Sequence, residues 1–341
     1  MRLIIFLCIL WAVVFPAAAG HQKPDGSLVI IGGALNPGTE AIYREFINLG
    51  GGPRAVEIAI IPAASATPSR TGRAYMKDFI HYGVSKRQIH IFPLALLDDP
   101  DTTGIDESTW SRNGWDKSLV ESLDHVTAVF FVGGDQMRYL LTLKDQDGND
   151  SPLLKRIRQI YRDGGVIGGT SAGAAIMCDP MLIGGSSITA LGPSPKNVVP
   201  LKPGMGFFTH GLVDQHFIKR GRLGRLIAAL FSSGDHKLGF GIDEDTALMA
   251  QGDRLTVIGN SGVFMIDITN AAHQATNRGM AASGITLHYL SGGDSYNLKP
   301  APFPSIPPAH PSNRARSITG NRRWTRTSSP KTPHTPLSPR G

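Results

Sequence analysis

The sequence predicts an α/β fold in which a mostly parallel sheet is flanked by helices. Short apolar runs rich in β-branched residues recur through the first half of the chain, and the segments between several of them suit helices. Strands that alternate with helices in this way form parallel sheets covered on both faces. Several runs also end in glycine or other small residues, where sheets of this class place their functional groups.

The expected strands are, in chain order, residues 28–31, 56–61, 88–93, 128–132 and 166–167. Small residues follow four of them, at Gly32-Gly33, Pro62-Ala63-Ala64, Gly133-Gly134 and 169–173. Because the carboxyl ends of parallel strands meet at one edge of a sheet, we expect these four segments to line one cleft. Later in the chain, residues 239–245, 256–258 and 263–266 are expected to contribute a closing set of strands.

The amino terminus has the three parts of a secretory signal peptide. Arg2 is followed by an apolar stretch over residues 3–15 and by Ala17-Ala18-Ala19 before Gly20. We expect residues 1–19 to be removed and the protein to be secreted, to the extracellular space or the periplasm. The stretch is shorter than the roughly 20 residues that span a bilayer, so no membrane attachment is expected after cleavage. An uncleaved anchor is the alternative.

The formal charge of +7 comes from the carboxyl-terminal tail. Residues 299–341 contain eight Lys or Arg, ten Pro and no Asp or Glu, and we expect them to be disordered. Without those eight residues and Arg2, 25 basic residues face 27 acidic ones, so no nucleic-acid partner is expected. Residues 20–298 then form a single α/β domain.

One pentapeptide carries the strongest chemical signal. Gly169-Thr170-Ser171-Ala172-Gly173 follows an apolar strand and has the G-x-S-x-G pattern of a nucleophile elbow, a tight turn that exposes a serine hydroxyl. Ser171 is therefore the candidate nucleophile, and the chain is interpreted as a serine hydrolase. The alternative is a glycine-rich turn whose serine only caps the following helix.

Four separated segments together resemble the cyanophycinase family of serine peptidases, family S51, which also contains aspartyl dipeptidase (peptidase E). They are 132–136 (VGGDQ), 169–174 (GTSAGA), 214–225 (DQHFIKRGRLGR) and 241–244 (GIDE). The resemblance implies a flavodoxin-like fold similar to class I glutamine amidotransferases, with 20–298 as the catalytic domain. It also implies hydrolysis of cyanophycin, an aspartate polymer that carries arginine on each β-carboxyl, to β-aspartyl-arginine. Relatives suggest a homodimer, and no cofactor is implied.

The resemblance assigns roles to individual residues. Ser171 attacks the carbonyl carbon, and His216, whose ordinary pKa lies near neutrality, takes the serine proton. The backbone N–H of Ala172 and one from Gly133 or Gly134 form the oxyanion hole. A packed histidine and a plain tight turn are the alternatives for these positions.

The resemblance also assigns a substrate-binding set. Planar guanidinium groups suit capture of the carboxylates along a polyaspartate backbone, with a solvated helix start as the alternative. Asp214 is expected to meet the substrate's guanidinium. The full set is Gln136, Asp214, Gln215, Arg220, Arg222 and Arg225.

The chain departs from the family at the third triad member. Relatives carry a carboxylate about fifteen to twenty residues past the serine, but residues 180–213 contain no Asp or Glu. Either Asp179, Asp214 or a distant residue such as Glu244 substitutes, or a Ser-His dyad operates, or activity is lost. An aspartyl dipeptidase and an inactive binder of acidic peptides therefore stay open as alternatives.

No metal site is expected. Residues 145–150 resemble a calcium loop, but the glycine is misplaced and the distal Glu is absent, so a solvated turn is the preferred interpretation.

Overall fold

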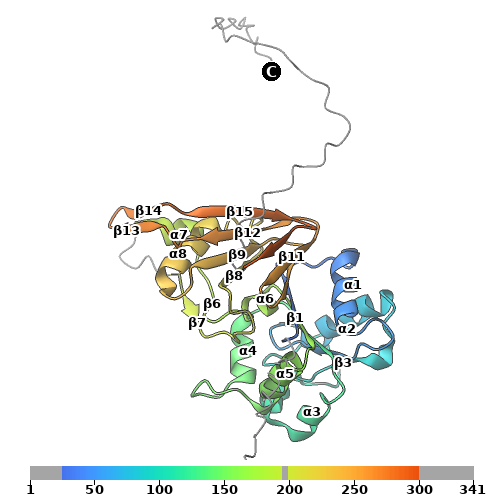
Figure 1. Cartoon of the computed structure of the whole chain (residues 1–341). Helices are drawn as coiled ribbons and strands as arrows, with labels where there is room; N and C mark the ends of the chain where they lie inside the picture. The colour runs from blue at the N-terminus through green and yellow to red at the C-terminus, as the bar shows by residue number, and fades with distance from the viewer. Residues whose placement is uncertain (1–24, 194–198, 299–341) are drawn as a thin grey trace, which may run out of the picture. The chain divides into compact units, whose positions relative to one another are not determined.

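A computed structural model describes residues 25–193 and 199–298 (Figure 1). The expected signal peptide and the expected disordered tail lie outside these residues. The described residues belong to one compact unit. Within them, no helix is both long and apolar enough to span a membrane.

An eight-stranded sheet forms the centre of the fold, in the order β16-β11-β10-β1-β5-β4-β2-β3. Strands β1, β5, β4, β2 and β3 run parallel, and β10, β11 and β16 add an antiparallel extension beside β1. The expected α/β class is therefore confirmed. The strands are β1 (Ser27–Ile31), β2 (Ile58–Ile61), β3 (Ile89–Ile91), β4 (Ala128–Phe131), β5 (Val166–Thr170), β10 (Thr246–Gln251), β11 (Arg254–Gly259) and β16 (Ser295–Asn297).

A second sheet of four strands has the order β15-β12-β9-β8, and its β8 and β9 are parallel. Two expected closing strands, at 256–258 and 263–266, therefore belong to different sheets. The chain changes direction between them at Gly259, whose φ of +114° lies in a region that glycine adopts readily because it has no Cβ. The strands of this sheet are β8 (Leu212–Gln215), β9 (Leu238–Ile242), β12 (Gly262–Asp267) and β15 (Thr286–Ser291). Two further antiparallel pairs join β6 (Met181–Leu182) to β7 (Leu201–Lys202), across the segment that contains α7 (Ser187–Leu191), and β13 (Ala272–Thr276) to β14 (Gly279–Ser283) in a hairpin.

Helices cover both faces of the central sheet. Successive side chains of a strand point to opposite faces, so Val29 and Ile31 join a core with α1 and α2, while Leu28 and Ile30 join a core with α4, α5 and α6. The helices are α1 (Glu40–Leu49), α2 (Pro68–His81), α3 (Lys117–Glu121), α4 (Gln136–Leu143), α5 (Pro152–Arg162), α6 (Ala172–Ala175), α7 (Ser187–Leu191) and α8 (Leu223–Ser233), with 3-10 turns at Lys86–Gln88 and Glu107–Trp115.

The two sheets meet at the carboxyl ends of β1 and β5. The first residue after β8, His216, donates its backbone N–H to the carbonyl of Gly32, the first residue after β1, at 2.6 Å. On the other side, the backbone N–H of Ser171, the first residue after β5, bonds the Ile31 carbonyl at 3.0 Å. Residues that are distant in the sequence therefore converge at one edge.

Phe130 anchors the core beneath α1 and α2, and its removal tests this packing. The side chain is 1% exposed and its ring lies 5.5 Å from Phe46, 5.4 Å from Phe79 and 4.9 Å from Tyr75. Phe130→Ala is expected to lower the free energy of unfolding by about 3–5 kcal/mol, measured by urea denaturation. Leu141→Ala, at a side chain 60% exposed, is the control and should change it by less than about 0.5 kcal/mol. Equal losses in both variants would contradict this account of the core.

Candidate active site

Ser171 occupies a strained turn between β5 and α6. Its φ of +53° is a left-handed value that few residues other than glycine adopt. Small neighbours permit the turn: a Cβ on Gly169 would lie 2.3 Å from the Gly173 carbonyl oxygen. The Ser171 side chain makes no capping bond to α6. The helix-cap alternative therefore does not describe this serine.

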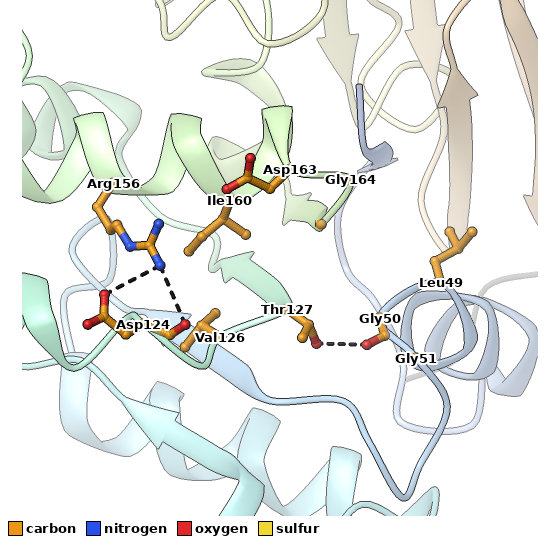
Figure 2. A pocket seen from close by; sticks show the side chains of 11 residues that line it. Leu49, Gly50, Gly51, Asp124, Val126, Thr127, Arg156, Ile160, Asp163 and Gly164 are labelled. Carbon is orange, nitrogen blue, oxygen red and sulfur yellow. Dashed lines mark hydrogen bonds and ion pairs between the residues drawn. The ribbon is translucent and has the colours of Figure 1, made fainter. Parts of the chain in front are cut away.

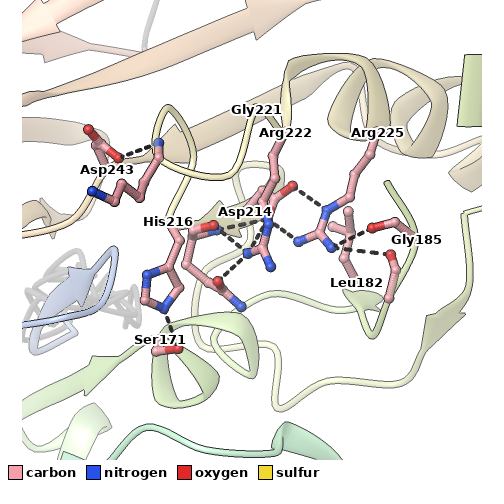
Figure 3. Close-up of polar contacts among 12 residues, drawn as sticks. Ser171, Leu182, Gly185, Asp214, His216, Gly221, Arg222, Arg225 and Asp243 are labelled. Atoms are coloured by element: carbon pink, nitrogen blue, oxygen red, sulfur yellow. Dashed lines mark hydrogen bonds and ion pairs between the residues drawn. The ribbon is translucent and has the colours of Figure 1, made fainter. Parts of the chain in front are cut away.

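The imidazole of His216 lies directly over Ser171. Its Nε2 is 2.8 Å from Ser171 Oγ (Figure 3). The ring is also close to Gly33, where a Cβ would come within 2.4 Å of its Cε1 and Nε2 atoms. Only glycine at position 33 lets the ring approach the β1 edge, so this residue has a site-shaping role that the sequence did not reveal.

Glu244 completes a relay of hydrogen bonds. Its Oε1 lies 2.7 Å from His216 Nδ1. A carboxylate at this distance accepts a hydrogen bond from Nδ1–H and so keeps the proton on Nδ1, which leaves Nε2 unprotonated and able to accept the proton of the serine hydroxyl. The structure thus brings Ser171, His216 and Glu244 together in the order that a triad requires.

The other two candidate acids do not reach the imidazole. Asp179 accepts the backbone N–H of Gly204 at 2.9 Å. Asp214 is 1% exposed, and Arg225 binds both of its carboxylate oxygens. Of the three stand-ins considered from the sequence, only Glu244 contacts His216.

The environment of His216 lowers its pKa below the usual 6.5. Burial is the largest cause, because it penalises the charged imidazolium, and the positive charges of Arg220 and Arg222 act in the same direction. The hydrogen bond that His216 donates to Glu244 opposes them by raising the pKa. The net shift keeps the imidazole neutral, and therefore basic, at neutral pH.

Backbone amides suitable for an oxyanion lie next to the serine. Gly133 is so close that a Cβ on it would sit 3.3 Å from Ser171 Cβ. Ala172 follows the serine as the first residue of α6. Within residues 25–193 and 199–298, no acceptor is bonded to the N–H groups of Gly133, Gly134 or Ala172. These amides are the donors expected for the oxyanion hole.

Asp214 and Arg225, two members of the expected binding set, are bonded to each other in the interior. Arg225 is 4% exposed; its Nε bonds Asp214 Oδ2 at 2.8 Å, and its Nη1 bonds the carbonyls of Gly184 and Gly185 at 3.3 and 3.1 Å (Figure 3). The pair is buried, and its charged groups are hydrogen-bonded to each other and to the two carbonyls. Its role is to fix the 184–185 loop and the end of β8.

Next to His216, the half-buried side chain of Arg222 contacts the buried side chain of Gln215. One Arg222 nitrogen, Nη1, contacts Asp214 and both the backbone and side-chain oxygens of Gln215. Burial lowers the pKa of Arg222 to about 10, with further lowering from Arg225 and Arg220. Its Nε and Nη2 bond no acceptor in the described part of the chain. Arg222 thus retains free donors for a ligand.

Arg220 and Gln136 are the remaining members of the expected binding set. Arg220 is exposed, and no carboxylate pairs with it among the described residues. Gln136, at the start of α4, donates its side-chain amide to the Leu182 carbonyl at 2.8 Å. Arg220 is therefore the most accessible cation of the predicted binding set, whereas Gln136 also has a structural partner.

A separate cavity of about 350 Å³ lies at the opposite end of the sheet (Figure 2). Its walls include Val126 and Thr127, which precede β4, and Gly164 and Gly165, which precede β5. The site residues follow these strands, so the cavity is not part of the candidate active site. No described group of three or more His, Cys, Asp or Glu is arranged to hold a metal ion.

Comparison with known proteins agrees with the resemblance seen in the sequence. The model of peptidase family S51 matches residues 28–258. A cyanophycinase of Geminocystis herdmanii is 38% identical over 288 residues, covering 82% of this chain and 96% of that protein. A cyanophycinase of Synechococcus elongatus is 36% identical over 287 residues, covering 82% of this chain and 81% of that protein.

The solved structure of a peptidase from an acI-B1 Actinobacterium shares the fold. It covers 81% of this chain and 98% of its own length, with a TM-score of 0.54 and 19% sequence identity. The family match and the curated relatives confirm the resemblance to cyanophycinases. The chain belongs to peptidase family S51 and is a serine-type hydrolase.

Proposed function

We propose that this protein is a secreted serine exopeptidase that hydrolyses cyanophycin to β-aspartyl-arginine dipeptides. The observation that carries the proposal is the relay from Ser171 Oγ to His216 Nε2 at 2.8 Å and from His216 Nδ1 to Glu244 Oε1 at 2.7 Å. The similarity to two cyanophycinases over about four fifths of the chain supports the choice of substrate.

In the first chemical step, Ser171 Oγ attacks the scissile carbonyl carbon while His216 Nε2 takes the hydroxyl proton. Glu244 stabilises the imidazolium that forms and holds the ring in its reactive tautomer. The negative charge that develops on the carbonyl oxygen is met by the N–H of Ala172 and that of Gly133 or Gly134. His216 then gives its proton to the leaving amine, which departs and leaves an acyl-enzyme.

In the second step, water attacks the acyl-enzyme, and His216 again acts first as base and then as acid. The serine hydroxyl is restored when the acyl group leaves as a carboxylate. Both steps need a neutral imidazole at the start, which the lowered pKa of His216 provides. The arrangement therefore supports a complete hydrolytic cycle.

The accessible cations support the choice of an acidic substrate. Arg220 and the free donors of Arg222 lie beside His216, where guanidinium groups can hold the carboxylates of a polyaspartate backbone. With Asp214 paired to Arg225, the substrate's own guanidinium needs another partner. The binding set proposed for this protein is accordingly Arg220, Arg222 and Gln215.

The two alternatives are an inactive binder of acidic peptides and an exported aspartyl dipeptidase. The inactive-binder interpretation rested on the missing acid, and the Glu244 contact with His216 removes that reason. An exported aspartyl dipeptidase would use the same relay on short peptides with N-terminal aspartate. Rates on cyanophycin and on Asp-Leu, compared side by side, distinguish the dipeptidase from the polymer-degrading enzyme.

Export and reaction can be tested in one experiment. The full chain is expressed in a bacterium with a secretory pathway, and the exported protein is recovered and incubated with cyanophycin. We expect a mature amino terminus at Gly20 and release of β-aspartyl-arginine, detected by mass spectrometry. Ser171→Ala should be exported equally and release the dipeptide about 10⁴-fold or more slowly than the parent, at a residual rate. Dipeptide release by the Ser171→Ala protein at a rate close to that of the parent would refute the mechanism, and retention of residues 1–19 would refute the proposed cleavage.

The identity of the third triad member can be tested by two conservative substitutions. Glu244→Gln offers an amide donor to His216 Nδ1 and favours the wrong tautomer, so kcat should fall by about 10⁴. Asp179→Asn keeps an acceptor for the Gly204 N–H and should leave kcat nearly unchanged. Steady-state kinetics on cyanophycin provide the measurement. The reverse pattern would identify Asp179 as the acid.

The pH profile tests the electrostatic account of His216. Only neutral His216 can act as the base, so kcat/KM should fall as the pH drops through its pKa, at a midpoint below 6.5. Arg220→Ala removes a cation that lowers this pKa, and the acid limb should therefore move to higher pH. KM should also rise by about tenfold or more through the loss of a charged hydrogen bond. Arg54→Ala, at an exposed residue before β2, is the control; an unmoved acid limb in Arg220→Ala would contradict the account.

A further inference from the structure

Three consecutive acids, Asp243-Glu244-Asp245, connect β9 to β10 and reach three different segments. Glu244 contacts His216, as described above. Asp243 accepts the backbone N–H of Lys219 at 3.2 Å, in the turn that follows His216 (Figure 3), and the Ser261 hydroxyl at 3.3 Å. The catalytic carboxylate therefore sits between two acids that both bond other parts of the chain.

Asp245 reaches the segment that follows β1. Its Oδ1 accepts the backbone N–H of Asn36 at 2.6 Å and the hydroxyl of Thr39 at 2.9 Å. These partners lie 209 and 206 positions away in the sequence. The contacts are therefore tertiary and are not those of a local turn.

The backbone around Asp245 bonds the same segment. The Asp245 N–H donates to the Gly33 carbonyl at 3.1 Å, and the Gly32 N–H donates to the Thr246 carbonyl at 2.9 Å. Asp245 has a φ of +50°, a left-handed value that Asp, Asn and Gly tolerate better than other residues. Side chain and backbone together hold residues 32–39 against the β9–β10 connection.

Residues 32–39 in turn hold the catalytic histidine. Gly33 lies against the imidazole, and the Gly32 carbonyl accepts the His216 N–H at 2.6 Å. A displacement of this segment would open space on the side of the ring that faces away from Glu244. Small misplacements of a catalytic group can cost about a hundredfold in rate.

We propose that Asp245 is a positioning residue of the active site: by binding Asn36 and Thr39, it holds the Gly32–Gly33 turn against His216 and keeps the imidazole in line with Ser171 and Glu244. It touches neither substrate nor the reacting atoms. The effect on catalysis rests on the function proposed above, whereas the effect on the 32–39 segment does not.

Variants of Asp245 can distinguish a role of its hydrogen bonds from a role of its charge. Asp245→Asn retains an Oδ1 acceptor and tolerates the left-handed backbone, but it removes the charge. Asp245→Gly retains the backbone freedom and removes the acceptor. Thr39→Val removes one of the two donors with little change in shape. Asp145→Gly is the matched control, because Asp145 also accepts two backbone N–H groups, those of Asp147 and Asn149, in the loop between α4 and α5.

Two measurements apply to all four variants. The first is the rate at which a fluorophosphonate labels Ser171, with kcat and KM on cyanophycin measured alongside. We expect Asp245→Gly to label and turn over about 10- to 100-fold more slowly with KM nearly unchanged, Thr39→Val to show a smaller loss, and Asp245→Asn and Asp145→Gly to stay within about threefold of the parent. The second is amide hydrogen exchange in residues 32–39, which should accelerate at least about tenfold in Asp245→Gly alone.

The outcomes separate the positioning role from the proposed function. If the parent is not labelled but exchange in 32–39 still depends on Asp245, the proposed function fails and the structural role stands. Loss of labelling in Asp245→Asn equal to that in Asp245→Gly would show that charge, not hydrogen bonding, matters and would overturn the inference. So would unchanged exchange and unchanged labelling in Asp245→Gly.

Discussion

The site depends on one constraint: the imidazole of His216 must lie within hydrogen-bond distance of a hydroxyl on one side and a carboxylate on the other. Ser171 comes from the end of β5, His216 from the end of β8 and Glu244 from the connection after β9. Four non-glycine residues of this region, Ala34, Ser171, His216 and Asp245, have left-handed φ values between +47° and +53°. Such backbone strain persists only where the surrounding structure enforces it, and it concentrates at functional sites.

Each of the two sheets supplies part of the site: Ser171 follows a strand of the first sheet, and His216 and Glu244 follow strands of the second. The parallel sheet presents the serine at its carboxyl edge, as open α/β sheets commonly present their reactive groups. The second sheet brings β8 and β9 side by side in parallel, so that the residues after both strands point to the same edge. The Asp214–Arg225 pair bonds the 184–185 loop, so Arg220 and Arg222 are the cations that act on His216. A buried ion pair of this kind adds little net stability, because the cost of removing both charges from water offsets their attraction. Its effect is to fix the local geometry.

The sequence predicted the local parts of this arrangement well. Ser171 lies in a pentapeptide whose small residues are needed by the turn itself, so its geometry follows from its neighbours. The parallel strands were expected within three residues of their observed bounds; the largest difference is at 166–167, which the structure extends to Val166–Thr170. Properties that depend on tertiary packing were not predictable. Spacing along the chain could not choose between Asp179 and Glu244, because only the fold brings one of them to the imidazole. Nor could it show that Asp214 and Arg225 are buried against each other, since both residue types also suit an exposed binding site.

The most direct test of the relay is whether its members act as a single unit. A double-mutant cycle with Ser171→Ala, Glu244→Gln and the combined variant measures this through kcat on cyanophycin, because residues that depend on one another show strongly non-additive losses. If Glu244 acts only by preparing His216 to activate the serine, the double variant should be no slower than Ser171→Ala alone. Losses that multiply in the double variant would show that Glu244 acts independently of the serine and would contradict the account.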